Sequence, residues 1–187
     1  LLTGGVDLSL GSVLVLAGVT AATFAHPGQY PLVVPLVIGV LTGALCGTVN
    51  GLVVTKGRVA PFIATLGMMT AARGLAYIVS KGRPVSNLAP AFTSIASGSL
   101  LGIPFPVLLL AVVAAASAVF LRGTRAGRHI YATGGNENAA YASGINVHAA
   151  KMYAYIICGA MAGLAGIVQA ARSTTGQPAA GIMYELD

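Results

Sequence analysis

Five long apolar runs constrain this 187-residue chain more than any other feature of its sequence. A helix needs about 20 mainly apolar residues to cross a bilayer, within a range of about 17–25. The runs that meet this length are residues 8–24, 32–55, 62–80, 103–121 and 152–171. Only the third run contains a charge, Arg73. We therefore predict an all-α, polytopic transmembrane helix bundle with about five spans and no pair of strands.

The composition excludes most classes of soluble protein. Only 7% of the residues are charged and the mean hydropathy is +0.85, whereas an average soluble domain carries about 25% charged residues. Five long, nearly uncharged runs disfavour the alternative, which is a large soluble protein with buried helices. The net charge of +6 does not indicate nucleic acid, because the bases lie in short gaps between apolar runs, where they orient a chain in a lipid bilayer.

The distribution of bases over these gaps predicts the orientation of the chain. The gaps at 55–60 and 122–151 hold six bases, and the alternate gaps hold three, Lys81, Arg83 and Arg172. Cytoplasmic loops carry the excess of Lys and Arg, so we expect the first set of gaps to face the cytoplasm. The chain does not begin with Met, and we expect it to be a fragment with further spans beyond both ends.

Glycines at helical spacing predict close helix packing. Lipid provides no hydrophobic drive between helices, so small residues that allow close approach hold them together. We expect mostly contacts within the chain, with one face available to a second subunit. Cys46 and Cys158 lie inside apolar runs and are interpreted as packing residues. The packing glycines are Gly39, Gly43, Gly47, Gly51, Gly159 and Gly163.

The sequence lacks the residue patterns of an enzyme. It contains four carboxylates and no HExxH, GxSxG or GxxxxGK[ST] motif, and the last of these is the loop that cradles nucleotide phosphates. We predict no catalytic residue, no metal and no cofactor. If the chain does active work, a partner must supply the energy.

A polar stretch at residues 4–12 allows two interpretations. Asp7 or Ser9 can cap the first span at the membrane interface, or a broken helix near the bilayer midplane can line a solute path. Arg73 can snorkel, face a polar cavity or pair with Asp7. The candidates for the path are Asp7, Ser9, Ser12, Asn50, Thr65 and Arg73.

The 30-residue gap at 122–151 is too long for a simple turn. Asn136 is placed to cap a short helix that Gly144 can end, and Asn146 to cap the fifth span. A two-turn helix is unstable alone in water. It is either an interfacial helix without a partner or a docking helix that enters a cleft of a cytoplasmic subunit. Its contact candidates are Gly135, Asn136, Glu137, Ala139, Ala140, Ser143 and Gly144.

The segments GGVDLSLGS, KGRVAPFIATLGMMTAARGLA, GRHIYATGGNENAAYASGINV and YELD resemble the permease subunit of bacterial ABC sugar importers of the ribose type. The similarity runs through essentially all 187 residues. It implies one transmembrane permease domain that pairs as a homodimer in the inner membrane, with cytoplasmic ATP-binding cassettes and an extracytoplasmic solute-binding protein. Residues 134–144 would touch the cassette, and residues 7–12 would lie near the path.

The resemblance implies ATP-driven import of a monosaccharide such as ribose by alternating access. The same architecture could carry a branched-chain amino acid or a nucleoside, and the residues do not decide between these solutes. A passive channel or an ion-coupled carrier is the alternative from another class. The lack of titratable groups inside the spans disfavours proton coupling.

Overall fold

The computed structural model describes residues 3–181, in which helices dominate. Four helices are long and apolar enough to cross a membrane. They are α2 (Val33–Thr55), α3 (Pro61–Val79), α5 (Phe105–Gly123) and α8 (Val147–Ser173). The shorter helices are α1 (Leu10–Thr23), α4 (Pro90–Ser97), α6 (Arg125–Gly135) and α7 (Glu137–Ala142). The prediction of a helical membrane bundle is confirmed.

The first predicted span is not a full-length helix. α1 has 14 residues and is about 21 Å long, short of the roughly 30 Å of a hydrocarbon core. Residues 5–9 before it have no regular secondary structure. The Asp7 carboxylate accepts hydrogen bonds from the Ser9 backbone N–H and hydroxyl, and such local bonds compete with helix formation. Of the two residues proposed as caps, the Ser9 side chain makes no cap hydrogen bond, whereas the Asp7 side chain accepts from the N–H of Ser9 just before α1.

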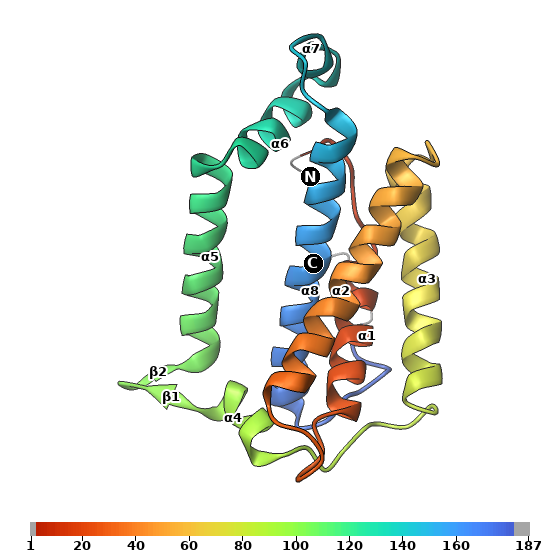
Figure 1. The fold of residues 1–187 in the computed structure, drawn as a ribbon. Helices are drawn as coiled ribbons and strands as arrows, with labels where there is room; N and C mark the ends of the chain where they lie inside the picture. Colours follow the sequence, from red (N-terminus) through yellow and green to blue (C-terminus); the bar gives the residue numbers. More distant parts are fainter. Residues whose placement is uncertain (1–2, 182–187) are drawn as a thin grey trace.

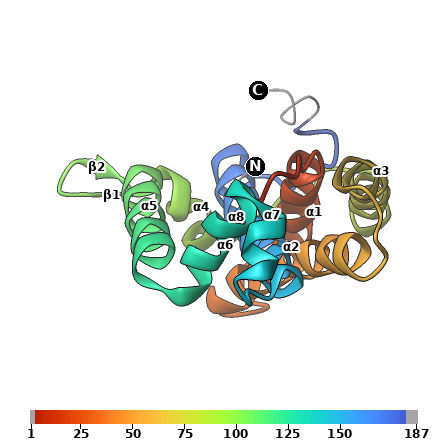
Figure 2. The ribbon, with the colours of Figure 1, turned by 90° about the horizontal axis from the view of Figure 1, so that it is seen from above.

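α1, α2 and α8 pack closely against one another, and we call these three helices the glycine core. α8 lies against both α1 and α2 over most of its length (Figures 1 and 2). A Cβ added at Gly43 or Gly47 would lie within 3.0 Å of α8 backbone atoms. A Cβ at Gly159 or Gly163 would meet the α2 backbone in the same way. Glycine is therefore required where these two backbones touch.

A second glycine contact joins α1 to α8. A Cβ at Gly18 would approach the Gly166 carbonyl, and one at Gly166 would approach the Leu14 carbonyl. Gly39 and Gly51 face the α8 side chains of Ile167 and Met152. All six packing candidates thus lie in contacts within the chain.

The segment between α3 and α5 closes one end of the glycine core, which we call the α4 end. Phe92 of α4 is fully buried against α1 and α8 residues. Val85 and Gly176 exchange backbone hydrogen bonds in an isolated antiparallel bridge. A hairpin of two-residue strands, β1 (Ser99–Leu100) and β2 (Ile103–Pro104), then leads into α5. The expectation of no strand pair is therefore wrong at this one turn.

α5, α6 and α7 form an arm, in which α5 stands away from the glycine core (Figure 1) and α6 contacts α8. No residue of α5 is buried, and seen from above α5 lies apart from α1, α2 and α3 (Figure 2). α6 returns from the end of α5 to α8, and α7 forms the tip beyond the spans (Figure 1). We call this end of the molecule the α7 end.

The gap predicted at 122–151 is mostly helical. α5 runs to Gly123, α6 and α7 follow, and α8 begins at Val147, five residues before the predicted span. Thr124 caps α6 by accepting a hydrogen bond from the Gly127 N–H. Because the spans alternate in direction, the gaps with six bases lie at the α7 end and the gaps with three bases at the α4 end (Figure 1).

Candidate functional site

The α7 end is built by three consecutive helices with side-chain caps. Thr124 caps α6, and α6 turns Gly127, Ile130 and Thr133 inward at a spacing of three residues, so that one face of the helix is buried. The remaining face carries Arg125 and Arg128, which are exposed. α6 was not predicted, although the Thr124 cap and this spacing were readable signals.

α7 follows the prediction closely in its local structure. The Asn136 side chain accepts a hydrogen bond from the Ala139 N–H at 3.0 Å, which confirms the predicted cap. Gly144 has φ +79° after the last turn, a conformation that favours glycine. Asn146 caps α8 in the same way as Asn136 caps α7, at 3.0 Å from the Ala149 N–H. The predicted boundaries of the short helix are therefore confirmed.

The exposed surface of α7 differs from the predicted contact set at one residue. Ala140 is only 4% exposed, so its side chain packs inside the protein and cannot contact a partner. Tyr141 is 76% exposed and was missed, although a large aromatic at the tip of a capped helix is a typical anchor for a partner. The other candidates are on the surface: Gly135, Asn136, Glu137, Ala139, Ser143 and Gly144.

A polar cavity of about 330 Å³ lies beneath the junction of α6 and α7. Glu137 and Lys151 form part of its wall, and the Lys151 ammonium donates to both Glu137 carboxylate oxygens at 2.8 Å. Thr133 also lines the cavity. Its hydroxyl is buried and has no hydrogen-bond partner among the described residues. The remaining lining residues are Thr3, Gly4, Gly5, Val54, Pro61, Gly134, Gly135, Asn136 and Tyr155.

Four of the six path candidates are buried. Two of them, Asn50 and Thr65, form hydrogen bonds to the irregular segment before α1. The Asn50 amide donates to the Ser9 hydroxyl at 2.9 Å, and the Leu8 N–H donates to the Thr65 hydroxyl at 3.3 Å. The side chains of Ser9, Asn50 and Thr65, and also that of Ser12, are buried inside the protein. Irregular backbone is tolerated in a bilayer only where protein or a water-filled cavity surrounds it. These contacts therefore fix the break in the helix.

Asp7 and Arg73 are half-buried and have different hydrogen-bond partners. Asp7 accepts from Ser9, whereas the Arg73 guanidinium donates to the carbonyl oxygens of Ala180 and Gly181. The contact of Arg73 with the segment after α8 was not among the predicted alternatives. The contribution of Asp7 and Arg73 to a solute path stays a prediction.

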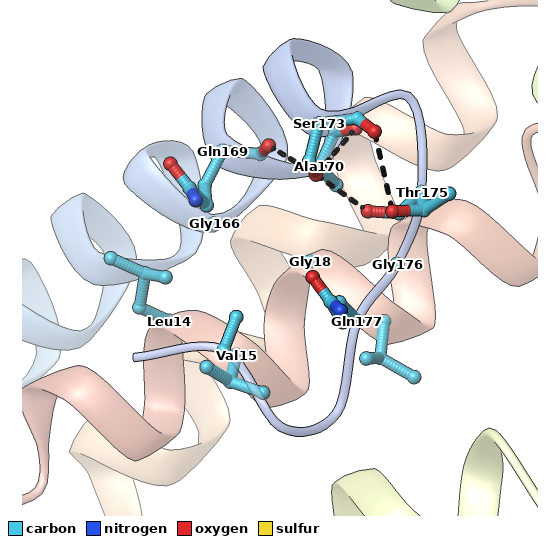
Figure 3. A pocket seen from close by; sticks show the side chains of 12 residues that line it. Leu14, Val15, Gly18, Gly166, Gln169, Ala170, Ser173, Thr175, Gly176 and Gln177 are labelled. Atoms are coloured by element: carbon cyan, nitrogen blue, oxygen red, sulfur yellow. Dashed lines mark hydrogen bonds between the residues drawn. The ribbon is translucent and has the colours of Figure 1, made fainter. Parts of the chain in front are cut away.

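A second, much smaller cavity lies at the α4 end (Figure 3). Its volume is about 10 Å³, which suffices for one water molecule. The Ser173 hydroxyl contacts the carbonyls of Gln169, Ala170 and Thr175 beside it. Of these two cavities, the one beneath the α6–α7 junction is therefore the larger by far.

Comparisons with known proteins agree with this architecture. Residues 1–187 match the family described as branched-chain amino acid transport system / permease component. The ribose import permease proteins of Haemophilus influenzae and Bacillus subtilis are 41% and 44% identical over the whole chain. The L-arabinose transport system permease protein of Escherichia coli K12 is 39% identical over the whole chain. No solved structure matches.

The chain spans only part of these relatives. It covers 59% of the Haemophilus influenzae protein, 58% of the Bacillus subtilis protein and 56% of the arabinose permease. Together with the four apolar helices, the similarity shows a multi-pass membrane protein. The motif YELD at residues 184–187, which belongs to the resemblance, lies outside the described residues.

Proposed function

Because the chain belongs to the family of branched-chain amino acid transport system permease components, we propose that it forms part of the membrane-spanning permease of an ATP-driven importer for a monosaccharide such as ribose. Similarity to ribose and arabinose permeases over the whole chain supports the choice of a sugar. The alternative cargo is a branched-chain amino acid, which the family description names.

The single observation that carries this proposal is the form of α7. This helix has a side-chain cap, projects beyond the spans and presents Tyr141 and Glu137 on its surface (Figure 1). With six residues it is too short to be stable by itself. A surface helix of this kind is suited to a cleft on a cytoplasmic ATP-binding subunit. The excess of bases at the α7 end supports a cytoplasmic position for it.

In the proposed mechanism the permease performs no covalent chemistry. Two copies enclose the solute path in the inner membrane, and an extracytoplasmic binding protein delivers the sugar. ATP-driven closure of the cassettes displaces α7, and the helices attached to it switch the path between outward and inward access. The outward-facing and inward-facing states must differ in affinity for the sugar. A ligand that binds both states equally does not shift the equilibrium between them.

The test uses the full-length permease assembled with its ATP-binding subunits and binding protein in proteoliposomes. We expect labelled ribose to accumulate only when ATP is supplied at the face that carries α7. Tyr141→Ala should reduce this uptake by at least about tenfold, since aromatic anchors dominate partner contacts. Tyr131→Ala, which removes an exposed tyrosine from α6, is the matched control and should retain uptake.

Three results would contradict the proposal in different ways. Equilibration of ribose without ATP would indicate a passive carrier. ATP-driven uptake of leucine but not ribose would indicate the alternative cargo. Equal uptake by the Tyr141 and Tyr131 variants would remove α7 from the contact with the cassette.

A further inference from the structure

α7 has few attachments to the rest of the protein. Ala140 is the only buried residue of α7. The contact between α7 and α8 is far smaller than the contact between α2 and α8. The cavity of about 330 Å³ lies between the α6–α7 junction and the helices α2, α3 and α8, so this junction is not packed directly on the glycine core. A displacement of α7 can therefore reach the core through the chain that joins α7 to α8 at residues 143–146, through Ala140 and through the few contacts that cross this cavity.

The ion pair between Glu137 and Lys151 is one of these contacts. Glu137 lies in the first turn of α7, and Lys151 lies in the second turn of α8, 14 residues later in the chain. The ammonium group contacts both carboxylate oxygens at 2.8 Å. The Lys151 side chain is 20% exposed, against 55% for Glu137. The Lys151 side chain is therefore mostly buried, and its ammonium group contacts the first turn of α7 through Glu137.

The position of Lys151 on α8 connects this ion pair to the glycine core. Met152, the next residue, contacts Gly51 of α2, and Tyr155, one turn later, packs against Gly47. At Gly51 the nearest atom is the Met152 side-chain sulfur, whereas at Gly47 a Cβ would collide with the Tyr155 backbone carbonyl. Lys151 therefore lies one turn before a contact between the α8 and α2 backbones that has little freedom to adjust.

We infer that the Glu137–Lys151 ion pair is the tether that transmits motion of α7 to α8, and that Lys151 is a positioning residue for transport. The inference rests on the proposed function and adds the route by which ATP-driven motion enters the glycine core. It does not require the pair to stabilise the fold, because exposed ion pairs contribute little to stability. The tether holds α7 in one orientation across the cavity beneath the α6–α7 junction.

The first experiment needs no transport activity. Hydrogen exchange is measured on the full-length permease before and after Lys151→Met, which keeps the apolar stem and removes the charge. We expect exchange of the α7 amides to rise about two- to fivefold, while the α8 amides stay within twofold of wild type. Lys56→Met, at the same end but outside the cavity lining, should leave α7 unchanged. Unchanged exchange in Lys151→Met would overturn the tether whether or not the protein transports a sugar.

The second experiment measures the ratio of ribose imported to ATP hydrolysed in the assembled transporter. We expect Lys151→Met to lower this ratio by about five- to tenfold, as for a lost coupling between two sites, while the ATP-binding subunits still copurify. Lys151→Arg, which keeps the positive charge opposite Glu137, should retain most of the ratio.

The outcomes separate the two claims. If wild type imports ribose with ATP and Lys151→Met keeps the wild-type ratio, the tether is wrong and the proposed function stands. If wild type imports no ribose, the proposed function fails, and hydrogen exchange alone decides the tether. A Lys151→Arg variant as impaired as Lys151→Met would also contradict the tether, since it keeps the attraction to Glu137.

Discussion

The long helices of the glycine core and α5 of the arm are all apolar, but they are held in opposite ways. In the core, α8 touches α1 and α2 through backbone atoms at Gly18, Gly43, Gly159 and Gly166. In the arm, α5 has no buried residue although it is the most hydrophobic of the four long helices. Hydropathy predicts that both regions enter the membrane, but only the spacing of small residues distinguishes the packed helices from the unpacked one.

The comparison indicates which part can move. Contacts between backbones have little freedom to adjust, because the interior of a protein is close-packed. At one end the short α4–β2 segment attaches the arm to the rest of the protein. At the other end the arm is attached by the contacts of α6 with α8 and by the Glu137–Lys151 ion pair. We therefore expect the core to behave as a rigid unit and the arm to change its position relative to it.

The largest effect should come from filling a glycine contact in the core. Gly43→Leu places a side chain where the Gly159 carbonyl and the Gly163 backbone lie. We expect a loss of at least about 3 kcal/mol in the free energy of unfolding, because neither backbone can retreat cheaply. Unfolding in mixed detergent micelles, followed by circular dichroism, measures it.

Gly67→Leu is the matched control for this substitution. Gly67 lies in α3, and nothing is within 4 Å of the position of its Cβ. The free energy of unfolding of the Gly67→Leu variant should stay within about 0.5 kcal/mol of the wild-type value. Equal losses in the two variants would show that the loss does not come from the contact at Gly43, because leucine raises the helix propensity at both positions.

A smaller effect should follow from removing a buried side chain of the core. Ile167→Ala empties a site that packs against Gly39 and the α1 alanines, and we expect a cost of about 2–4 kcal/mol. Leu110→Ala in α5 deletes the same number of carbon atoms from an exposed position and should cost less than about 0.5 kcal/mol. The same detergent titration measures both, and a cost for Leu110→Ala close to that for Ile167→Ala would refute the contrast between core and arm.

The smallest stability effect concerns the break before α1. Ser9→Ala removes the acceptor of the buried Asn50 amide, and we expect a loss of about 1 kcal/mol, as is typical of hydrogen bonds between membrane helices. Thr48→Ala on the same helix as Asn50 is the control, because that hydroxyl bonds only to the Ala44 carbonyl of its own helix. If the two variants were equally stable, the polar contacts would not hold the break.

Much of the fold could be predicted because membrane helices have strong local signals. Length and hydropathy identified α2, α3, α5 and α8, and the amides of Asn136 and Asn146 identified the starts of α7 and α8. The signals failed where polar contacts between distant residues decide the structure. The apolar run that contains α1 looked like a full span, but residues 5–9 are not helical and bond to Asn50 and Thr65, which lie far away in the sequence.

The candidate site was predictable only in part, for a similar reason. The pattern around Asn136 placed a short helix at the tip, but the pattern did not show that Ala140 faces inward and Tyr141 outward. The cavity beneath α7 also escaped prediction, because its wall combines residues from the N-terminal segment, α2, α3, α6, α7 and α8. Contacts between residues so far apart in the sequence leave no local pattern.

The central claim is that ATP moves the arm against a rigid glycine core, and distances between spin labels test it most directly. Labels at Leu45 of α2 and Met161 of α8 report on the core, and labels at Leu45 and His129 of α6 report on the arm, after Cys46 and Cys158 are replaced by alanine. In the full transporter, addition of ATP should leave the Leu45–Met161 distance unchanged and shift the Leu45–His129 distance. A shift between Leu45 and Met161 with a constant distance to His129 would contradict the account.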